Sequence, residues 1–384
     1  MVIVRKEKFN SEKSIQYISD KAEKTENKSG MEDLKLGAAI DIGTTSIAVG
    51  LFDMENEVLL GNLTQTNCQT KFGSDVMMRI MHCTNGKEQL LHDMLIEQIE
   101  NIITVIIEQN ISEKYKSYVV ERMTVVGNTT MCHIFLNRDV TGLSGAPFSM
   151  AYKGIANVNS QEVGFKIYNI SEIIVLPNIH SHVGADAMSV LCNEKLYKKD
   201  LNEIAIDIGT NAEIILNRHS DVYTSTAAGP AFEGKGIYSG IRAGAGAINS
   251  VKISRVNGNI ILGMLDDGTK QSPKGICGSG LIDAISELLK AGVLTKDGYL
   301  LTKQEAVAAN VNINLCNCLD NSDERIGNYF VLSEKNKIIV TQKDIRNVQL
   351  AKGAIQAGVE VLLEKAGITM NDIEKIKIAG VFGK

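Results

Sequence analysis

A seven-residue string that occurs twice constrains this chain more than any other feature. The first copy, Ala39–Thr45, reads Ala-Ile-Asp-Ile-Gly-Thr-Thr, and the second, Ala205–Asn211, differs from it only in the last residue. Each copy follows a short apolar run and ends in small, turn-prone residues, which predicts a buried strand running into a tight turn. The copies are separated by the length of a domain, so the sequence predicts two duplicated subdomains.

The residue types of this turn suit the phosphates of a nucleotide. A glycine lets the backbone approach an anion closely, and the threonine hydroxyl and neighbouring N–H groups can donate to phosphate oxygens. The aspartate, Asp41 in the first copy and Asp207 in the second, can hold Mg²⁺ through water. A single turn of this type also occurs in ordinary hairpins, so the inference depends on the repetition. We expect the two subdomains to face each other across a nucleotide cleft.

Length and charge narrow the classes of protein. The 384 residues suffice for two domains, and 44% apolar with 22% charged residues is typical of a soluble globular protein. A net charge of -5 with no basic tail disfavours nucleic acid as a partner. No apolar run approaches the roughly 18 residues of a membrane span. The N-terminus lacks the apolar stretch of a signal peptide, so we expect a cytoplasmic protein that does not bind membranes.

The seven cysteines give no sign of a metal cluster. None lies in a C-x-x-C pair, and no run has the spacing of an iron–sulfur or zinc site. Cys316 and Cys318 come closest, but a C-x-C in a polar loop more often holds two free thiols. We therefore expect reduced, structural thiols, as the cytoplasmic compartment favours.

The order of the patterns divides the chain into three parts. Residues 1–36 are polar and indicate a tail or linker, residues 37–200 a first subdomain and residues 201–384 a second. The expected elements are a hairpin over 38–52, strands over 58–62, 122–126, 173–177 and 376–378, and helices over 89–109 and 341–367. The hairpin pattern returns after residue 204, which supports an α/β fold built from a duplicated unit.

Two helical patterns carry more specific expectations. Thr341 and Asp344 have the spacing of a capping box at the start of the last helix. Met77, Met78 and Met81 fall at helical spacing, which predicts a packed helix face rather than a cofactor role.

Three further positions have both a chemical and a structural interpretation. Gly127-Asn128-Thr129-Thr130 is a strand-to-helix turn, either placing donors where an anion could bind or forming an ordinary N-capped helix. Asp186 opens a helix, either as a carboxylate favoured by the helix dipole, which the residues alone favour, or as a catalytic base. Cys277 precedes a helix, where a thiol can become reactive, but a tight helix start explains the residues equally well.

The glycine-dense stretch from Gly229 to Gly246 matches neither of two common nucleotide-binding motifs. It contains no G-x-G-x-x-G between a strand and a helix. Gly229 to Lys235 has the G-x-x-x-x-G-K spacing, but Gly236 stands where a P-loop needs Ser or Thr. Neither a Rossmann site nor a P-loop is supported.

Taken together, these motifs resemble those of a known superfamily. The two Asp-Ile-Gly-Thr turns, Gly127 to Thr130 and the terminal Ile378 to Gly383 resemble the phosphate, connecting and adenosine motifs of the acetate kinase, sugar kinase, heat-shock chaperone and actin superfamily. The strings Gly229–Gly234, Gly275–Leu281 and Gln349–Lys352 are similar, more closely, to the C-terminal ATPase domain of the ATP-dependent reductive activators of corrinoid proteins. The resemblance runs from about residue 37 to the end.

The resemblance implies a fold and a function. The fold would be two duplicated ribonuclease H-like subdomains, an actin-like ATPase, with the nucleotide cleft between them. The function would be to use ATP and Mg²⁺ to drive an uphill electron transfer that returns cob(II)alamin to cob(I)alamin. The partner would be a corrinoid protein or a corrinoid iron–sulfur protein.

The resemblance also implies roles for individual residues. Asp41 and Asp207 would position Mg²⁺ and water, and Asp186 would orient the attacking water. The phosphates would be held from opposite sides by the two turns, and the adenosine would lie against the terminal glycines. The residues so assigned are Gly43, Thr44, Thr45, Gly209, Thr210, Asn211, Gly380 and Gly383.

Three departures from the family pattern modify these expectations. No cysteine precedes Cys68, so we expect no iron–sulfur cluster within this chain and electrons from a separate ferredoxin-like donor. The chain stops at Lys384, directly after the adenosine motif, so we expect a C-terminally truncated second subdomain. Cys68 stands where the family's Asn-Pro-Gln string has proline, which predicts a looser loop.

Three hypotheses for the function follow. The first is an ATPase that activates a corrinoid protein. The second is a small-molecule kinase of the same fold, and the third is a non-catalytic module that binds a nucleotide or a partner. The oligomeric state is left open, with a homodimer as one option.

Overall fold

The computed structural model describes residues 34–73, 75–111, 117–193, 201–209, 211–217, 222–226, 228–265 and 272–379. The chain divides into two compact units, Met1–Lys199 and Asp200–Lys384. The expected tail over residues 1–36 lies outside the described residues except at its end.

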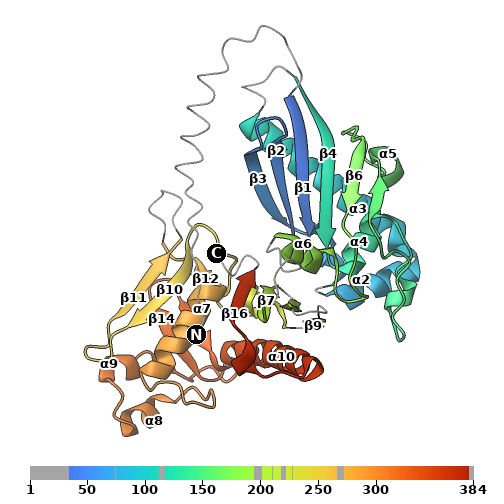
Figure 1. Ribbon diagram of the computed structural model, residues 1–384. Coiled ribbons are helices and arrows are strands. Elements are labelled where there is room, and N and C mark those ends of the chain that lie inside the picture. The colour runs from blue at the N-terminus through green and yellow to red at the C-terminus, as the bar shows by residue number, and fades with distance from the viewer. Residues whose placement is uncertain are drawn as a thin grey trace. The chain divides into compact units, whose positions relative to one another are not determined.

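A mixed six-stranded sheet forms the centre of the first unit, in the order β3-β2-β1-β4-β6-β5 (Figure 1). The first three strands form an antiparallel meander, and β4 and β6 then run parallel to β1. The strands are β1 (Leu34–Ile42), β2 (Ser46–Asp53), β3 (Val58–Thr66), β4 (Tyr118–Gly127), β5 (Ala156–Val158) and β6 (Glu172–Val175). The predicted hairpin and strands of this unit are therefore confirmed. Most are longer than expected, but β6 ends at Val175, two residues before the expected end.

Strand β1 begins at Leu34, inside the segment expected to be a tail. Leu36 explains the difference because its side chain is fully buried and its backbone pairs with Asp53 on β2 and Val120 on β4. Leu34 and Leu36 alternate with Lys35 as in a strand, but three residues beside a polar segment are too short a pattern to predict the extension from the sequence. The first strand of the hairpin, expected from residue 38, therefore begins four residues earlier, at Leu34.

Helix α3 (Glu88–Asn110) confirms the long amphipathic helix expected over 89–109. Its apolar face packs into a single core with the sheet, and Leu91, Leu95, Ile99 and Ile103 are fully buried there. The other helical segments of the unit are η1 (Cys68–Phe72), α2 (Val76–His82), η2 (Cys83–Lys87), α4 (Thr129–Phe135), η3 (Thr141–Leu143), α5 (Ser160–Val163) and α6 (Ala185–Asn193).

Helix α2 corrects the expectation for the methionines. The side chains of Met77, Met78 and Met81 are 46%, 37% and 44% exposed, whereas Arg79 and Ile80 are buried. The spacing places the three methionines on one stripe of the helix, but it does not say which stripe faces the core. The inward stripe of this short helix holds a guanidinium, and the prediction of a packed methionine face was wrong.

A four-stranded sheet of the second unit, in the order β16-β7-β8-β9, repeats the arrangement of β4, β1, β2 and β3 in the first unit. Strands β7 (Glu203–Ile208), β8 (Ala212–Asn217) and β9 (Val222–Thr226) form the meander, and β16 (Lys375–Ala379) runs parallel to β7 as β4 does to β1. The repeated topology extends the repeated sequence string to a duplicated supersecondary unit. Helix α10 (Gln342–Ala366) packs against this sheet through Val359 and Leu362.

The ends of α10 are as the sequence predicts. The Thr341 hydroxyl accepts the N–H of Asp344, whose carboxylate accepts the N–H of Thr341, so the capping box is confirmed. Gly367 closes the helix in the left-handed conformation, with φ of 65°. The last strand, expected over 376–378, is confirmed as β16.

A second core fills the remainder of this unit. It packs α7 onto the sheet β11-β10-β12 and joins the small sheet β13-β14-β15. The segments are η5 (Pro230–Glu233), β10 (Ala247–Ile253), β11 (Ile260–Met264), β12 (Gly275–Ile276), α7 (Gly278–Lys290), α8 (Lys303–Ala308), α9 (Ile313–Cys316), β13 (Leu319–Asp320), β14 (Tyr329–Ser333), β15 (Ile338–Thr341) and η6 (Met370–Asp372). No helix within these described ranges is both long and apolar enough to cross a membrane.

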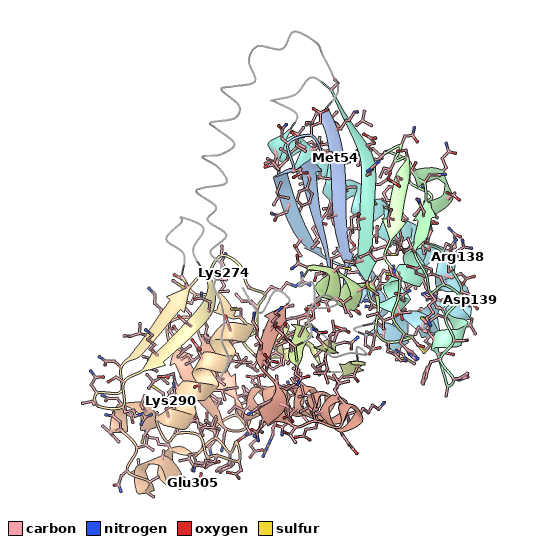
Figure 2. The ribbon with its side chains drawn as sticks, in the orientation of Figure 1. Met54, Arg138, Asp139, Lys274, Lys290 and Glu305 are labelled. Carbon is pink, nitrogen blue, oxygen red and sulfur yellow. The ribbon has the colours of Figure 1, made fainter. Side chains whose placement is uncertain are left out.

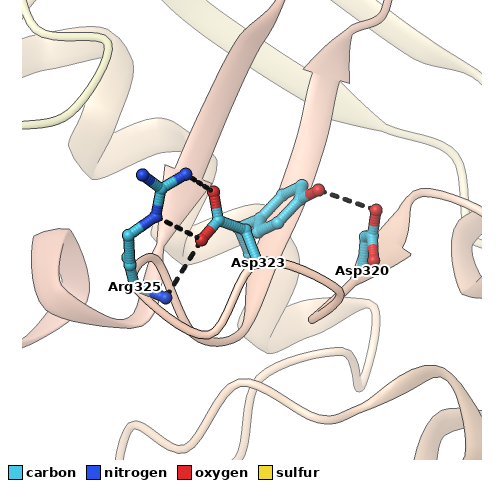
Figure 3. Close-up of polar contacts among 4 residues, drawn as sticks. Asp320, Asp323 and Arg325 are labelled. Carbon is cyan, nitrogen blue, oxygen red and sulfur yellow. Dashed lines mark hydrogen bonds and ion pairs between the residues drawn. The ribbon is translucent and has the colours of Figure 1, made fainter.

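A polar loop joins β13 to β14 at the surface of this core. The Tyr329 hydroxyl donates to the Asp320 carboxylate at 2.7 Å, and the Arg325 guanidinium donates to both oxygens of Asp323 at 3.0 and 2.9 Å (Figure 3). Because these groups are largely solvated, the contacts shape the loop and add little to the stability of the fold.

Candidate functional site

The first Asp-Ile-Gly-Thr string forms the turn between β1 and β2. The N–H of Gly43 donates to the carbonyl oxygen of Ser46 at 2.8 Å and closes the turn. Asp41 lies opposite Ala48 on β2 and Val126 on β4, and its side chain is exposed. Burial alternates along β1, so the aspartate lies on the face of the strand opposite the core residues.

The second string forms a tighter turn between β7 and β8. The N–H of Gly209 donates to the carbonyl oxygen of Asn211 at 3.0 Å. The last paired residues are Ile208 and Ala212, whereas the first turn closes between Ile42 and Ile47, so the second turn is one residue shorter. Two turns of nearly identical sequence therefore differ in geometry.

The two aspartates also differ in environment. Burial raises the pKa of the Asp207 carboxyl above its ordinary value, and this desolvation is the only cause of the shift. Its neighbour across the sheet is the buried Glu213, whereas Asp41 lies opposite Ala48. The carboxylate of Asp207 is thus in a drier site than that of Asp41.

The connecting motif lies beside the first turn. The side-chain amide of Asn128 donates to the Thr44 hydroxyl at 2.9 Å, and its carbonyl oxygen accepts the N–H of Met131 at 3.0 Å. Asn128 is therefore the N-cap of α4 and a neighbour of the phosphate-type turn at once. The two interpretations left open by the sequence are compatible.

Asp186 joins this group from the first turn of α6. Gly184, just before the helix, packs so closely that a Cβ there would lie 2.6 Å from the Asn128 Cα atom. The charges of Asp186 and Asp41 both act on the buried Cys132 thiol, after burial itself, and raise its pKa well above its ordinary value. The structure thus brings Asp41, Asp186 and Asn128 together at the carboxyl ends of β1 and β4.

Two residues for which the sequence indicated no role, Asn67 before η1 and Arg79 in α2, bind the first turn. The Asn67 side-chain amide donates to the carbonyl oxygen of Gly43 at 2.8 Å, and its backbone N–H donates to that of Thr45 at 2.9 Å. The Arg79 guanidinium donates to the carbonyl oxygen of Thr44 at 3.2 Å. Burial lowers the pKa of Arg79 to about 10. No pattern of spacing signalled these contacts.

The expected loosening of the segment at Cys68 does not occur. Its N–H donates to the Gln98 side chain at 2.7 Å, and its thiol donates to the carbonyl oxygen of Met94 at 3.4 Å. Both contacts tie the segment to α3. Cys68 is the first residue of η1, a position where proline is also accepted, because Asn67 is the N-cap.

The structure leaves three of the expected site residues untested and gives a structural explanation for Cys277. Thr210, Gly380 and Gly383 lie outside the described residues. Cys277 is buried, and its thiol lies 3.3 Å from both the carbonyl oxygen of Ile248 and the Ser279 hydroxyl, which favours the tight helix start. Within the described ranges, no group of three or more His, Cys, Asp and Glu side chains is arranged to hold a metal ion.

A pocket of about 380 Å³ lies elsewhere in the first unit, at the end of α4. Arg138 and Asp139, labelled in Figure 2, line it together with Glu88 and the kinked segment η2. Its wall holds one cation, Arg138, and two carboxylates, Glu88 and Asp139, among neutral residues, and this lining indicates no class of ligand.

Comparisons with known proteins agree across both units. Residues 36–199 match a family model described as the RACo middle region, and residues 202–384 match one described as the C-terminal domain of RACo, the ASKHA domain. A solved structure described as a reductive activator for corrinoid, iron-sulfur protein superposes with a TM-score of 0.81 at 33% identity. That match covers 93% of this chain and 56% of the other.

Two curated proteins are similar over most of this chain. The corrinoid activation enzyme RamQ of Eubacterium limosum is 35% identical over 356 residues, which are 90% of this chain and 58% of that protein. A [Co(II) methylated amine-specific corrinoid protein] reductase of Methanosarcina barkeri is 27% identical over 374 residues, 90% of this chain and 63% of that protein. The chain thus spans about three fifths of the length of these relatives.

Proposed function

Because this chain belongs to the RACo family and has its α/β ASKHA fold, we propose that it is an ATP-binding and ATP-hydrolysing module that drives reductive activation of a corrinoid protein. In the proposed reaction, one electron from a separate ferredoxin-like donor reduces Co(II) to Co(I) on that partner. Hydrolysis of ATP to ADP and phosphate supplies the driving force. The functions of the similar proteins, corrinoid activation and reduction of a Co(II) corrinoid protein, support a corrinoid protein as the partner.

The observation that carries the nucleotide part is the duplicated strand arrangement. In each unit an Asp-x-Gly-Thr turn follows the first strand of a three-stranded meander, β1 or β7, and that strand also pairs in parallel with a fourth strand, β4 or β16. Asp41 and Asp207 occupy the same place in the two arrangements. Such a repetition suits a ligand with several phosphates. It also supports the proposal of an actin-like ATPase fold, in which two ribonuclease H-like halves bind one nucleotide between them.

Each proposed residue has a defined task in this module. Thr44 and Thr45 donate to the phosphates from one side, beside Gly43, which lets the backbone approach the anion closely. Thr210 and Asn211 donate from the other side, beside Gly209. Gly380 and Gly383 lie against the adenosine, and Asp186 orients the attacking water. The hydrogen bond from Asn128 to the Thr44 hydroxyl supports this arrangement, because a hydroxyl that accepts from Asn128 directs its own hydrogen elsewhere.

The residues present suit Mg²⁺. This hard cation prefers carboxylate oxygens and keeps several waters, which matches single carboxylates at Asp41 and Asp207 rather than a dense cage of ligands. Asp207 is the better placed of the two, because a cation would stabilise the charged form that burial now disfavours. Mg²⁺, when bound, neutralises charge on the phosphate oxygens.

The test combines binding, turnover and the redox state of a partner. A ligand at about 100 times its dissociation constant stabilises the native state by roughly 2.7 kcal/mol, so millimolar Mg·ATP should raise the unfolding temperature by a few degrees. Phosphate release should then increase when a Co(II) corrinoid protein and a reduced ferredoxin are added, and Co(I) should appear in the absorption spectrum. No thermal shift with Mg·ATP would contradict the proposal, and a phosphorylated metabolite would indicate a kinase.

A further inference from the structure

We propose that Arg79 and Asn67 are positioning residues for the first phosphate-binding turn. They bind its carbonyl oxygens on the protein side and thereby hold its N–H groups toward the anion. The inference rests on the proposed nucleotide function and adds residues to the site that the family comparison and the motif do not assign.

The first step is that three successive carbonyl oxygens of the turn are bound from one side. The carbonyl oxygen of Gly43 accepts from the Asn67 side chain, that of Thr44 from the Arg79 guanidinium and that of Thr45 from the Asn67 backbone. The distances are 2.8, 3.2 and 2.9 Å. Asn67 and Arg79 therefore fix the orientation of the three peptide groups whose carbonyl oxygens belong to Gly43, Thr44 and Thr45.

The second step follows from peptide geometry. In a planar trans peptide the C=O and the next N–H point in opposite directions. The peptides of this turn are trans. When the carbonyl oxygens of Gly43 and Thr44 face Asn67 and Arg79, the N–H groups of Thr44 and Thr45 face away from them. Successive N–H groups that point the same way form a concave anion site.

The third step concerns the charge of Arg79. Its side chain is 0% exposed, and its guanidinium donates to the Gln69 side chain at 3.1 Å and to the carbonyl oxygens of Thr44 and Gly73. These three acceptors are all neutral. The Nε atom of Arg79 has no hydrogen-bond partner among the described residues. Asp75 is the acidic residue whose charge favours the cation.

A buried cation hydrogen-bonded only to neutral groups is costly for a fold. Because Arg79 lies directly behind the first turn, its buried charge can act on a phosphate bound there. In a medium of low dielectric constant, a positive charge behind the turn attracts a phosphate more strongly than a solvated one would. Arg79 therefore contributes both the direction of the N–H groups and a favourable potential.

Gln69 fixes the position of the Arg79 guanidinium. Its side-chain oxygen accepts from Arg79, and its side-chain nitrogen donates to the carbonyl oxygen of Leu91 on α3 at 2.8 Å. The turn, the segment 67–79 and the central helix of the unit are thus joined in one hydrogen-bonded chain. A substitution at Arg79 should therefore alter the conformation of the turn more than the packing of the core.

The experiment compares Arg79→Met and Arg79→Lys with the wild-type protein. Binding of Mg²⁺ with a non-hydrolysable ATP analogue is measured by titration calorimetry, and amide hydrogen exchange of residues 43–46 is measured without nucleotide. Arg79→Met should weaken binding at least tenfold and accelerate exchange at the turn. Arg79→Lys, which keeps the charge and one donor, should lie between the wild type and Arg79→Met.

Glu100→Gln is the matched control. Glu100 is also buried, and its carboxylate accepts the N–H groups of Lys166 at 2.8 Å and Ile167 at 2.6 Å, away from the turn. This variant should lower the unfolding temperature and leave both nucleotide affinity and exchange at the turn unchanged.

The outcomes separate the inference from the proposed function. Arg79 variants that bind nucleotide as the wild type does, with unchanged exchange at residues 43–46, would overturn the inference. If the wild-type protein binds no nucleotide, the proposed function fails, and the exchange rates alone decide whether Arg79 orients the turn. If Arg79→Met does not fold, Arg79→Lys supplies the comparison.

Discussion

The side-chain amide of Asn128 lies 2.9 Å from the hydroxyl of Thr44 and donates a hydrogen bond to it. This contact joins two motifs that are far apart in the sequence, the connecting turn before α4 and the first phosphate-type turn. Because Asn128 also caps α4, the position of the Thr44 hydroxyl is tied to the start of that helix. The donor group proposed for the phosphate is thus held by a helix terminus rather than by the turn alone.

Thr44→Val should weaken Mg·ATP binding about tenfold or more. The substitution keeps the shape of the side chain and removes a hydroxyl donor, and a hydrogen bond to a charged group contributes about 1.5–3 kcal/mol. Titration calorimetry checks the affinity. Thr104→Val is the matched control, since its hydroxyl lies 2.7 Å from that of Tyr168 and far from the turn. Equal losses of affinity in both variants would contradict the role of Thr44.

Asp207→Asn should abolish most Mg·ATP binding and yet stabilise the protein without ligand at neutral pH. Burial raises the pKa of this carboxyl, so the charged form costs stability, which is lost as the pH rises through the raised value. The neutral amide removes that cost. The gain of the variant over the wild type should therefore shrink as the pH falls toward the ordinary value of 3.8.

Urea unfolding at several pH values and nucleotide titration measure the two effects of Asp207→Asn. Glu324→Gln is the control, because this exposed carboxylate, in the surface loop between β13 and β14, should change neither. A variant that is less stable than the wild type at pH 7 would show that the Asp207 carboxylate is a structural group.

The sequence could predict what local patterns encode. Both hairpins, α3, α10 with its capping box and the last strand follow from apolar periodicity and turn residues, which act over a few positions. The connecting motif at Asn128 was found for the same reason. Its contact with Thr44 depends on the parallel pairing of β1 with β4, which the residues made plausible but did not fix.

What escaped prediction depends on tertiary packing. An arginine among exposed methionines in α2 looks like a surface charge, yet Arg79 faces inward because the turn and Gln69 offer acceptors there. Two nearly identical strings gave Asp41 and Asp207 different burial, since their cross-strand neighbours differ. Such differences arise from residues distant in the sequence.

Gly184→Ala should destabilise the first unit by about 1–3 kcal/mol, the usual cost of overpacking. An added Cβ would lie 2.6 Å from the Asn128 Cα atom and from the backbone of Gly127 and Thr129, none of which can rotate away. Helix α6 must then shift, and Asp186 with it, so phosphate release should fall more than nucleotide affinity. Gly145→Ala is the control, because nothing lies within 4 Å of its added Cβ.

Acid should destabilise the first unit through His133, a buried residue of α4. One ring nitrogen lies 2.7 Å from the carbonyl oxygen of Thr129, and the other accepts the N–H of Tyr152 at 3.2 Å. The ring is therefore neutral, with its hydrogen on Nδ1. Burial lowers its pKa below the ordinary 6.5, so the unfolded chain takes up a proton at a higher pH than the native protein does.

The sign of the pH effect follows from this difference. As the pH falls from about 6.5 toward the lowered value, the unfolded state binds more protons, and the free energy of unfolding decreases by at most about 1.4 kcal/mol per pH unit for this one group. His133→Asn, which keeps a donor for Thr129, should flatten the profile by up to one proton. Urea unfolding of both proteins between pH 8 and pH 5 measures the slopes, and the difference at pH 8, before the imidazole titrates, reports the packing cost alone. Parallel profiles for the two proteins would show that His133 does not set the acid sensitivity of α4.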